Sequence, residues 1–178
     1  MNKIVNTNKV FKCILASTNQ NRNADVFLPE ELWKSINTIK SKAVNINHEN
    51  SELIGFCSDA YAVDKEYNRI EELTPPPYFH IMATIVLNGS SPKALAVIEK
   101  LEKTKGYVSM ECLFSDFDYM LSNSTEQIVI PYDETTAFLN KYIRNEYDGY
   151  AVGRVLRNFS FDCLGVVDEP ANTYSVIL

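Results

Sequence analysis

The sequence predicts an α+β domain built around an antiparallel sheet or barrel. Short runs of β-branched and aromatic residues recur along the chain, only a few segments show a helical period, and no repeat or linker divides the chain. A chain of 178 residues fits one domain, so we expect residues 1–178 to fold together. An apolar share of 46 % and a charged share of 22 % allow a sizeable core.

The charge and the length of the apolar runs exclude two classes of partner. A formal net charge of -6 argues against a nucleic-acid binder, which needs clustered Lys and Arg to displace phosphate counterions. The apolar runs, such as residues 81–87, fall far short of the ~20 residues that span a bilayer. We therefore expect a soluble intracellular protein that binds neither nucleic acid nor membrane.

The first part of the chain alternates between strand and helix patterns. Residues 9–17 are rich in β-branched and aromatic residues, which predicts a strand. Pro29 opens a helix that ends near Ser41 and places four apolar residues on one face: Leu32, Trp33, Ile36 and Ile39. Residues 43–47 alternate apolar and polar side chains, as half-buried strands do, and this strand delivers His48 at its end.

The middle of the chain is mostly β. Residues 49–52 are polar and predict a turn, and residues 53–63 predict a strand. The proline run at residues 75–77 is a rigid, non-helical connection to a further strand at residues 79–87.

A helix and a strand with unusual polar residues come next. Pro92 begins a helix that Gly106 ends, with its apolar face formed by Ala94, Val97, Ile98 and Leu101. Residues 107–114 predict a buried strand, and it carries two polar side chains, Ser109 and Glu111. These two side chains lie on the same face because their spacing is two.

The last part of the chain predicts one helix and one strand. A helical pattern covers residues 135–145, residues 154–167 predict a strand, and residues 168–172 predict a loop.

The four cysteines give little support for a metal or redox site. They are widely spaced and contain no CxxC pair: Cys13, Cys57, Cys112 and Cys163. We therefore expect reduced, buried thiols and no metal or other cofactor.

The search for an activated nucleophile is short because the chain has two histidines. His48 stands at a strand end, where its ring can reach a cleft, whereas His80 lies inside an apolar strand and suggests a structural role. Ser109 is either hydrogen-bonded in the core or placed for chemistry. A serine hydroxyl needs a neighbouring imidazole to take its proton, so the catalytic hypothesis requires the strands of His48 and Ser109 to meet.

Three separated segments resemble the motifs of the prohead (procapsid maturation) proteases of tailed phages. Their order and spacing also match, and the likeness covers roughly residues 43–178. The segments are Val44-Asn-Ile-Asn-His48-Glu-Asn50 with the following Ile54-Gly55, then Gly106-Tyr-Val-Ser109-Met-Glu111, then Gly165-Val-Val-Asp-Glu-Pro-Ala-Asn172.

The resemblance implies a fold and a catalytic centre. This family is similar to the herpesvirus assemblins, whose fold is an antiparallel β-barrel surrounded by helices. By resemblance, Ser109 is the nucleophile, His48 is the general base and a carboxylate is the third member, for which we predict Asp162. Many relatives have an acidic residue where this chain has Cys163, so Asp162 requires a bulge that turns it toward the site.

Glu111 is the second candidate for the third role, because it shares a strand face with Ser109, and Asp168 is the third. A carboxylate in this role would orient the imidazole and stabilise its charged form. Gly165 is a weak candidate for the oxyanion hole, whose backbone donors leave no sequence signature.

The resemblance also implies a biological role. A prohead protease cleaves scaffold and major capsid proteins, and often itself, inside the procapsid in the host cytoplasm. Assemblins act as dimers, so a homo-oligomer fits the resemblance. The alternative function is a non-catalytic capsid or scaffold assembly protein that retains the protease fold.

Overall fold

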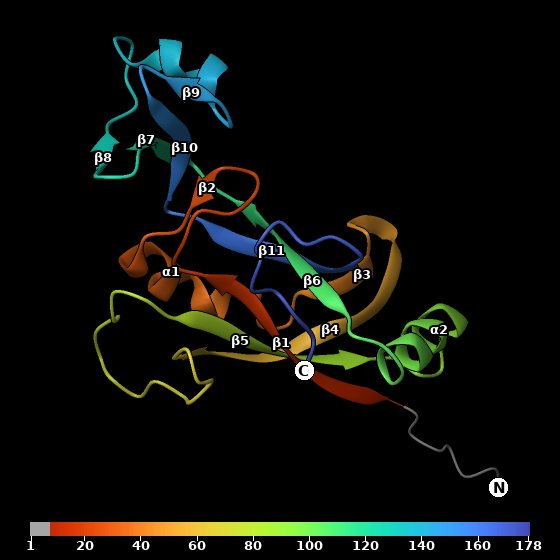
Figure 1. Ribbon diagram of the computed structural model, residues 1–178. Helices are drawn as coiled ribbons and strands as arrows, with labels where there is room; N and C mark the ends of the chain where they lie inside the picture. The colour runs from red at the N-terminus through yellow and green to blue at the C-terminus, as the bar shows by residue number, and fades with distance from the viewer. Residues whose placement is uncertain (1–7) are drawn as a thin grey trace, which may run out of the picture.

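The computed structural model describes residues 8–178 and is a mixed α+β fold made mostly of strands. A six-stranded curled sheet forms the body, and a smaller sheet projects from it (Figure 1). The first seven residues of the predicted 1–178 domain lie outside the described residues.

The main sheet brings together strands from both ends of the chain. Four of its five neighbouring pairs are antiparallel, as predicted, and the pair β3–β11 is parallel. In spatial order the strands are β1 (Lys9–Ser17), β5 (His80–Leu87), β4 (Glu49–Val63), β3 (Ala43–Ile46), β11 (Ser160–Val167) and β6 (Tyr107–Leu113).

The last residues of the chain connect the two edge strands of this curled sheet. The Ile177 N–H donates to the carbonyl of Gly106, just before β6, at 2.9 Å. The Leu178 N–H donates to the carbonyl of Lys12 in β1 at 2.8 Å. Residues 177–178 therefore satisfy backbone groups on both edges, which would otherwise be left unpaired.

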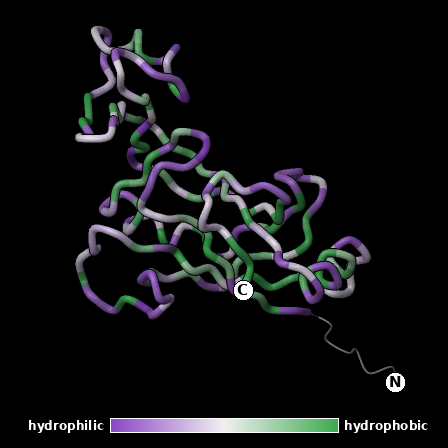
Figure 2. The backbone as a smooth tube through the Cα atoms, in the orientation of Figure 1, coloured by the Kyte–Doolittle hydropathy of each residue, from purple (hydrophilic) through white to green (hydrophobic). Residues whose placement is uncertain are grey.

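Helices cover the sheet and complete the core. The predicted helix at Pro29 is α-helical only over α1 (Pro29–Ser35) and continues as the 3₁₀ helix η1 (Ile36–Ile39). The Ser35 hydroxyl donates a hydrogen bond to the Leu32 carbonyl, and the Thr38 hydroxyl donates one to the Ser35 carbonyl. Such side-chain hydrogen bonds compete with the backbone hydrogen bonds of an α-helix. Hydrophobic residues gather along the strands of the body, as Figure 2 shows.

The predicted helix at Pro92 is confirmed as α2 (Pro92–Leu101), which ends before Gly106. Ala94 and Ile98 are buried against the main core, as the helical period predicted. Within residues 8–178, no helix is long and apolar enough to cross a bilayer.

The smaller sheet has a core of its own, formed by Tyr119, Leu121, Leu139 and Val152. The helix predicted at residues 135–145 is the 3₁₀ helix η2 (Ala137–Tyr142). The strand predicted at residues 154–167 is two strands, broken at Asn158, whose φ is 47°. The sheet consists of β2 (Asp25–Val26), β10 (Tyr150–Arg157), β7 (Asp116–Ser122) and β8 (Gln127–Ile130), with β9 (Glu146–Tyr147) paired to β10.

Candidate functional site

His48 lies in the tight turn between β3 and β4. Ile46 pairs with Glu49, so Asn47 and His48 are the two turn residues, with φ of 52° and 64°. Two left-handed residues match the right-handed twist of an antiparallel pair. The turn predicted at residues 49–52 is therefore wrong, because the chain reverses earlier and β4 begins at Glu49.

A buried asparagine holds this turn in place. The side-chain oxygen of Asn45 accepts the backbone N–H of His48 at 3.1 Å. Alternation along residues 43–47 predicted a polar face for Asn45, but this residue is fully buried. Sequence reasoning thus missed a residue that positions His48; the only signal was an asparagine three residues before the histidine.

Glu111 is the carboxylate beside His48. Its Oε1 lies 2.6 Å from His48 Nδ1, and the two side chains are 39 % and 30 % exposed. These two atoms are in close contact without a hydrogen bond of acceptable geometry, and they form an ion pair only when the imidazole is protonated.

Ser109 lies on the same strand face as Glu111, two residues away along β6. In the register of β6 and β11, Ser109 is opposite Gly165, and a side chain at Gly165 would lie 3.0 Å from His48 Nδ1. The imidazole therefore occupies the space that Gly165 leaves open, next to its cross-strand neighbour Ser109. In the described part of the chain, the Ser109 hydroxyl makes no hydrogen bond to His48 or to another group.

Asp162, the predicted third member, is paired elsewhere. The strand does contain the required bulge, because Phe161 and Cys163 face consecutive residues of β6 and Asp162 is the extra residue. However, the Asp162 carboxylate lies 3.6 Å from Lys42 Nζ. Asp168, the third candidate, pairs with Lys100 at 2.8 Å. The carboxylate that contacts His48 is therefore that of Glu111 and not that of Asp162 or Asp168.

Cys163 joins His48 and Glu111 in a compact cluster. One ligating atom from each of the three residues lies within 4.8 Å of the other two. Burial, followed by the neighbouring Glu111 carboxylate, raises the pKa of the Cys163 thiol to about 12. The Asn45 side-chain amide donates to Cys163 Sγ at 3.5 Å, so Asn45 contacts both the turn and the thiol.

His80 has a structural environment, as its place in an apolar strand suggested. It is 4 % exposed, and its Nδ1 lies 2.7 Å from the buried Ser17 Oγ. The rings of Tyr78 and Tyr174 pack against it. Burial, and then the positive charge of Lys65, lower its pKa. Both members of this serine–histidine pair are buried.

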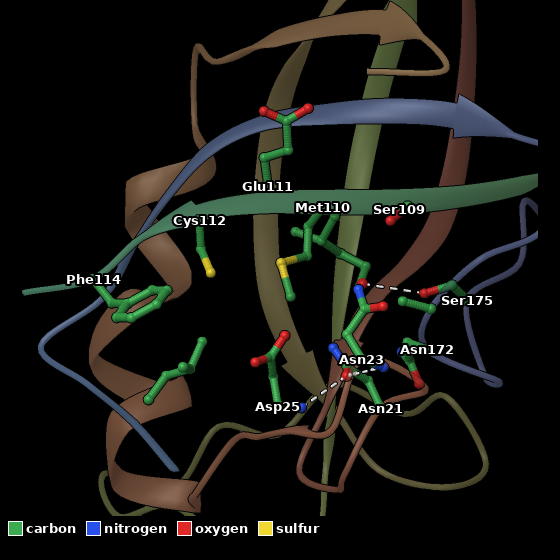
Figure 3. Close-up of a pocket in the computed structure, with 13 residues that line it drawn as sticks. Asn21, Asn23, Asp25, Ser109, Met110, Glu111, Cys112, Phe114, Asn172 and Ser175 are labelled. Carbon is green, nitrogen blue, oxygen red and sulfur yellow. Dashed lines mark hydrogen bonds between the residues drawn. The ribbon is translucent and has the colours of Figure 1, made fainter. Parts of the chain in front are cut away.

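A cavity of about 230 Å³ lies on the face of β6 opposite to the Glu111 side chain (Figure 3). Met110 and Cys112 point from β6 into this cavity, toward Asp25, whereas Glu111 points away from it. Asp25 is held by Arg154, whose Nε donates to the carboxylate at 2.9 Å. The cavity is therefore separated by the strand from the carboxylate that contacts His48.

All four cysteines are free, and Cys13, Cys57 and Cys163 are buried, in agreement with the expectation of reduced thiols.

Comparison with family models, curated proteins and solved structures finds no match to this chain.

Proposed function

We propose that the chain is a serine endopeptidase in which Ser109 is the nucleophile, His48 the general base and Glu111 the group that orients the imidazole. The contact of His48 Nδ1 with Glu111, on the strand face that carries Ser109, supports this function best. A nucleophile, a base and an orienting carboxylate are the parts that activate a serine hydroxyl.

The ring orientation suits the proton transfers. With Nδ1 beside Glu111, the other ring nitrogen, Nε2, is left to accept the Ser109 proton. The Ser109 oxygen attacks the peptide carbonyl, and His48 returns the proton to the leaving amine. Water then attacks the acyl-enzyme with the same base, and the acid product leaves. Glu111 stabilises the imidazolium that forms in both steps.

The missing hydrogen bond between Ser109 and His48 is compatible with this mechanism. Catalytic hydrogen bonds are often long without substrate and shorten in the Michaelis complex.

We further propose that the enzyme is a maturation protease of the prohead type, with its curled sheet as an assemblin-like barrel. Residues of all three resembling segments meet at one place: His48 from the first, Ser109 and Glu111 from the second, and Gly165 from the third. Scaffold and major capsid proteins inside a procapsid in the host cytoplasm would be its substrates, self-cleavage would accompany this activity, and a homo-oligomer fits the same proposal.

An active-site label tests the catalytic part of this proposal. A fluorophosphonate probe should add once to the wild-type chain by intact mass. Labelling should fall by at least about 10³-fold in both Ser109→Ala and His48→Ala, because the two groups act as a unit. Ser115→Ala, an exposed serine beyond the end of β6, is the matched control and should label like wild type.

Two results would contradict the proposal. Undiminished labelling of Ser109→Ala would place the nucleophile elsewhere. A folded wild-type chain that neither labels nor cleaves a peptide library would favour the alternative, a capsid or scaffold assembly protein without activity.

A further inference from the structure

We propose that His48, Glu111 and Cys163 form a binding site for a thiophilic divalent cation of the Zn²⁺ class. The three residues come from the β3–β4 turn, from β6 and from β11, and their ligating atoms converge to within 4.8 Å of one another. The sequence could not predict this site, because cysteine spacing alone shows no metal motif and the three strands are distant in the chain.

The geometry suits a four-coordinate ion. Zinc binds nitrogen, oxygen and sulfur at about 2.0–2.3 Å, so tetrahedral ligand atoms lie roughly 3.3–3.8 Å apart. The observed atoms bracket this spacing, since Nδ1 and Oε1 are 2.6 Å apart and the whole set spans at most 4.8 Å. Small side-chain rotations would open the first distance and shorten the longest. The partial exposure of His48 and Glu111 leaves the fourth position to water.

The ligand chemistry also favours this class of cation. His48 Nδ1 is buried and lacks a hydrogen-bond partner in the described part of the chain, so ligation of a cation through Nδ1 would break no existing hydrogen bond. Imidazole with thiolate is typical of zinc, whereas Mg²⁺ and Ca²⁺ prefer sites made of oxygen ligands alone. A single carboxylate does not change this preference.

Asn45 provides the support that metal ligands need. Its amide donates to Cys163 Sγ, and its side-chain oxygen holds the backbone of His48. Such outer hydrogen bonds fix the orientation of ligands and stabilise a thiolate. Zinc binds cysteine as the thiolate, so binding would exchange the Cys163 S–H proton for the cation and release that proton to solvent.

Binding of this ion and acyl transfer exclude each other, an inference that rests on the proposed function. A cation on Nδ1 of a neutral imidazole leaves the ring proton on Nε2, which then cannot accept the Ser109 proton. It also removes Glu111 from its orienting role. Zinc should therefore suppress fluorophosphonate labelling of the wild-type chain, and a chelator should restore it.

Cobalt provides a direct test that does not depend on activity. Titration of the full chain with Co²⁺ should give a thiolate-to-cobalt charge-transfer band and the visible bands of a tetrahedral ion. Cys163→Ser should lose the charge-transfer band, and both Cys163→Ser and Glu111→Gln should weaken binding by at least about tenfold. Cys112→Ser is the matched control, because it removes another free cysteine that lies on β6 outside the cluster.

The outcomes separate the two proposals. A folded wild-type chain that shows no charge-transfer band at millimolar Co²⁺ overturns the metal site, as does a band lost in Cys112→Ser but kept in Cys163→Ser. Circular dichroism identifies any variant that fails to fold. If Cys163→Ser does not fold, the Co²⁺ affinity of Glu111→Gln, which keeps the thiol, tests the metal site instead. Metal binding without serine labelling would leave the cation site standing and remove the peptidase, and labelling without metal binding would do the reverse.

Discussion

At the scale of single residues, the sequence left fewer candidates for the proposed base and nucleophile than for the proposed third member. The chain has two histidines and one serine in an apolar strand, and the structure places His48 over Gly165, the cross-strand neighbour of Ser109. The choice between Asp162 and Glu111 depended on a bulge, because one extra residue changes the direction of the following side chains. The bulge is present, but local pairing with Lys42 decides where the Asp162 carboxylate lies.

Two isosteric substitutions compare the carboxylates. Glu111→Gln should slow fluorophosphonate labelling by about 10³- to 10⁴-fold, as loss of the orienting carboxylate does in other triads. Asp162→Asn should change the rate by less than about threefold, because its exposed pair with Lys42 contributes little. The pseudo-first-order labelling rates of both variants and wild type provide the measurement. A large loss in Asp162→Asn with normal labelling in Glu111→Gln would return the third role to Asp162.

At the scale of elements, patterns with strong local signals were predicted well. The strands predicted at residues 9–17 and 107–114 form as β1 and β6, and the helix at Pro92 forms as α2. These predictions followed from composition, period and a proline at the first helical turn. The failures were turns without glycine. Asn47–His48 and Asn158 adopt left-handed conformations that tertiary pairing enforces, and neither carries the glycine that usually announces a hairpin.

The turn at His48 can be tested through its backbone. His48→Ala and His48→Gly both remove the imidazole and differ mainly in how readily the residue adopts a φ of 64°. Glycine has no Cβ to clash in the left-handed region, so His48→Gly should be more stable than His48→Ala by about 1 kcal/mol. Urea unfolding of the two variants measures this difference. Equal stabilities, or a less stable glycine variant, would show that the turn relaxes out of this conformation.

At the scale of the whole molecule, the α+β class was predictable but the assembly of the strands was not. The site depends on pairing of β3 with β11, which brings Asn45 against Cys163 across 118 residues of chain. No local pattern specifies such a pair, because hydrophobic periodicity gives the face of a strand and not its neighbour. The projecting sheet has a small core of its own, separate from the main core. The stability of the main core around the site therefore depends on contacts within the body of the protein.

Residues 177–178 are such a contact, and their side chains can be tested without altering the site. Ile177 is 8 % exposed, belongs to the main core and bridges Cys13 of β1 to Gly106 beside β6. Ile177→Ala should lower the free energy of unfolding by roughly 2–4 kcal/mol, because it leaves a cavity where the two sheet edges meet.

Ile128→Ala is the matched control for this substitution. Ile128 is 39 % exposed and lies in β8 of the smaller sheet, so its truncation should cost less than about 1 kcal/mol. Trp33, the only tryptophan, packs against Phe79 in the main core, and its fluorescence during urea unfolding reports on the body of the protein. If Ile177→Ala shifted the Trp33 transition no more than Ile128→Ala does, residues 177–178 would lie against the sheet edges without stabilising them, and the curl would depend on the strands alone.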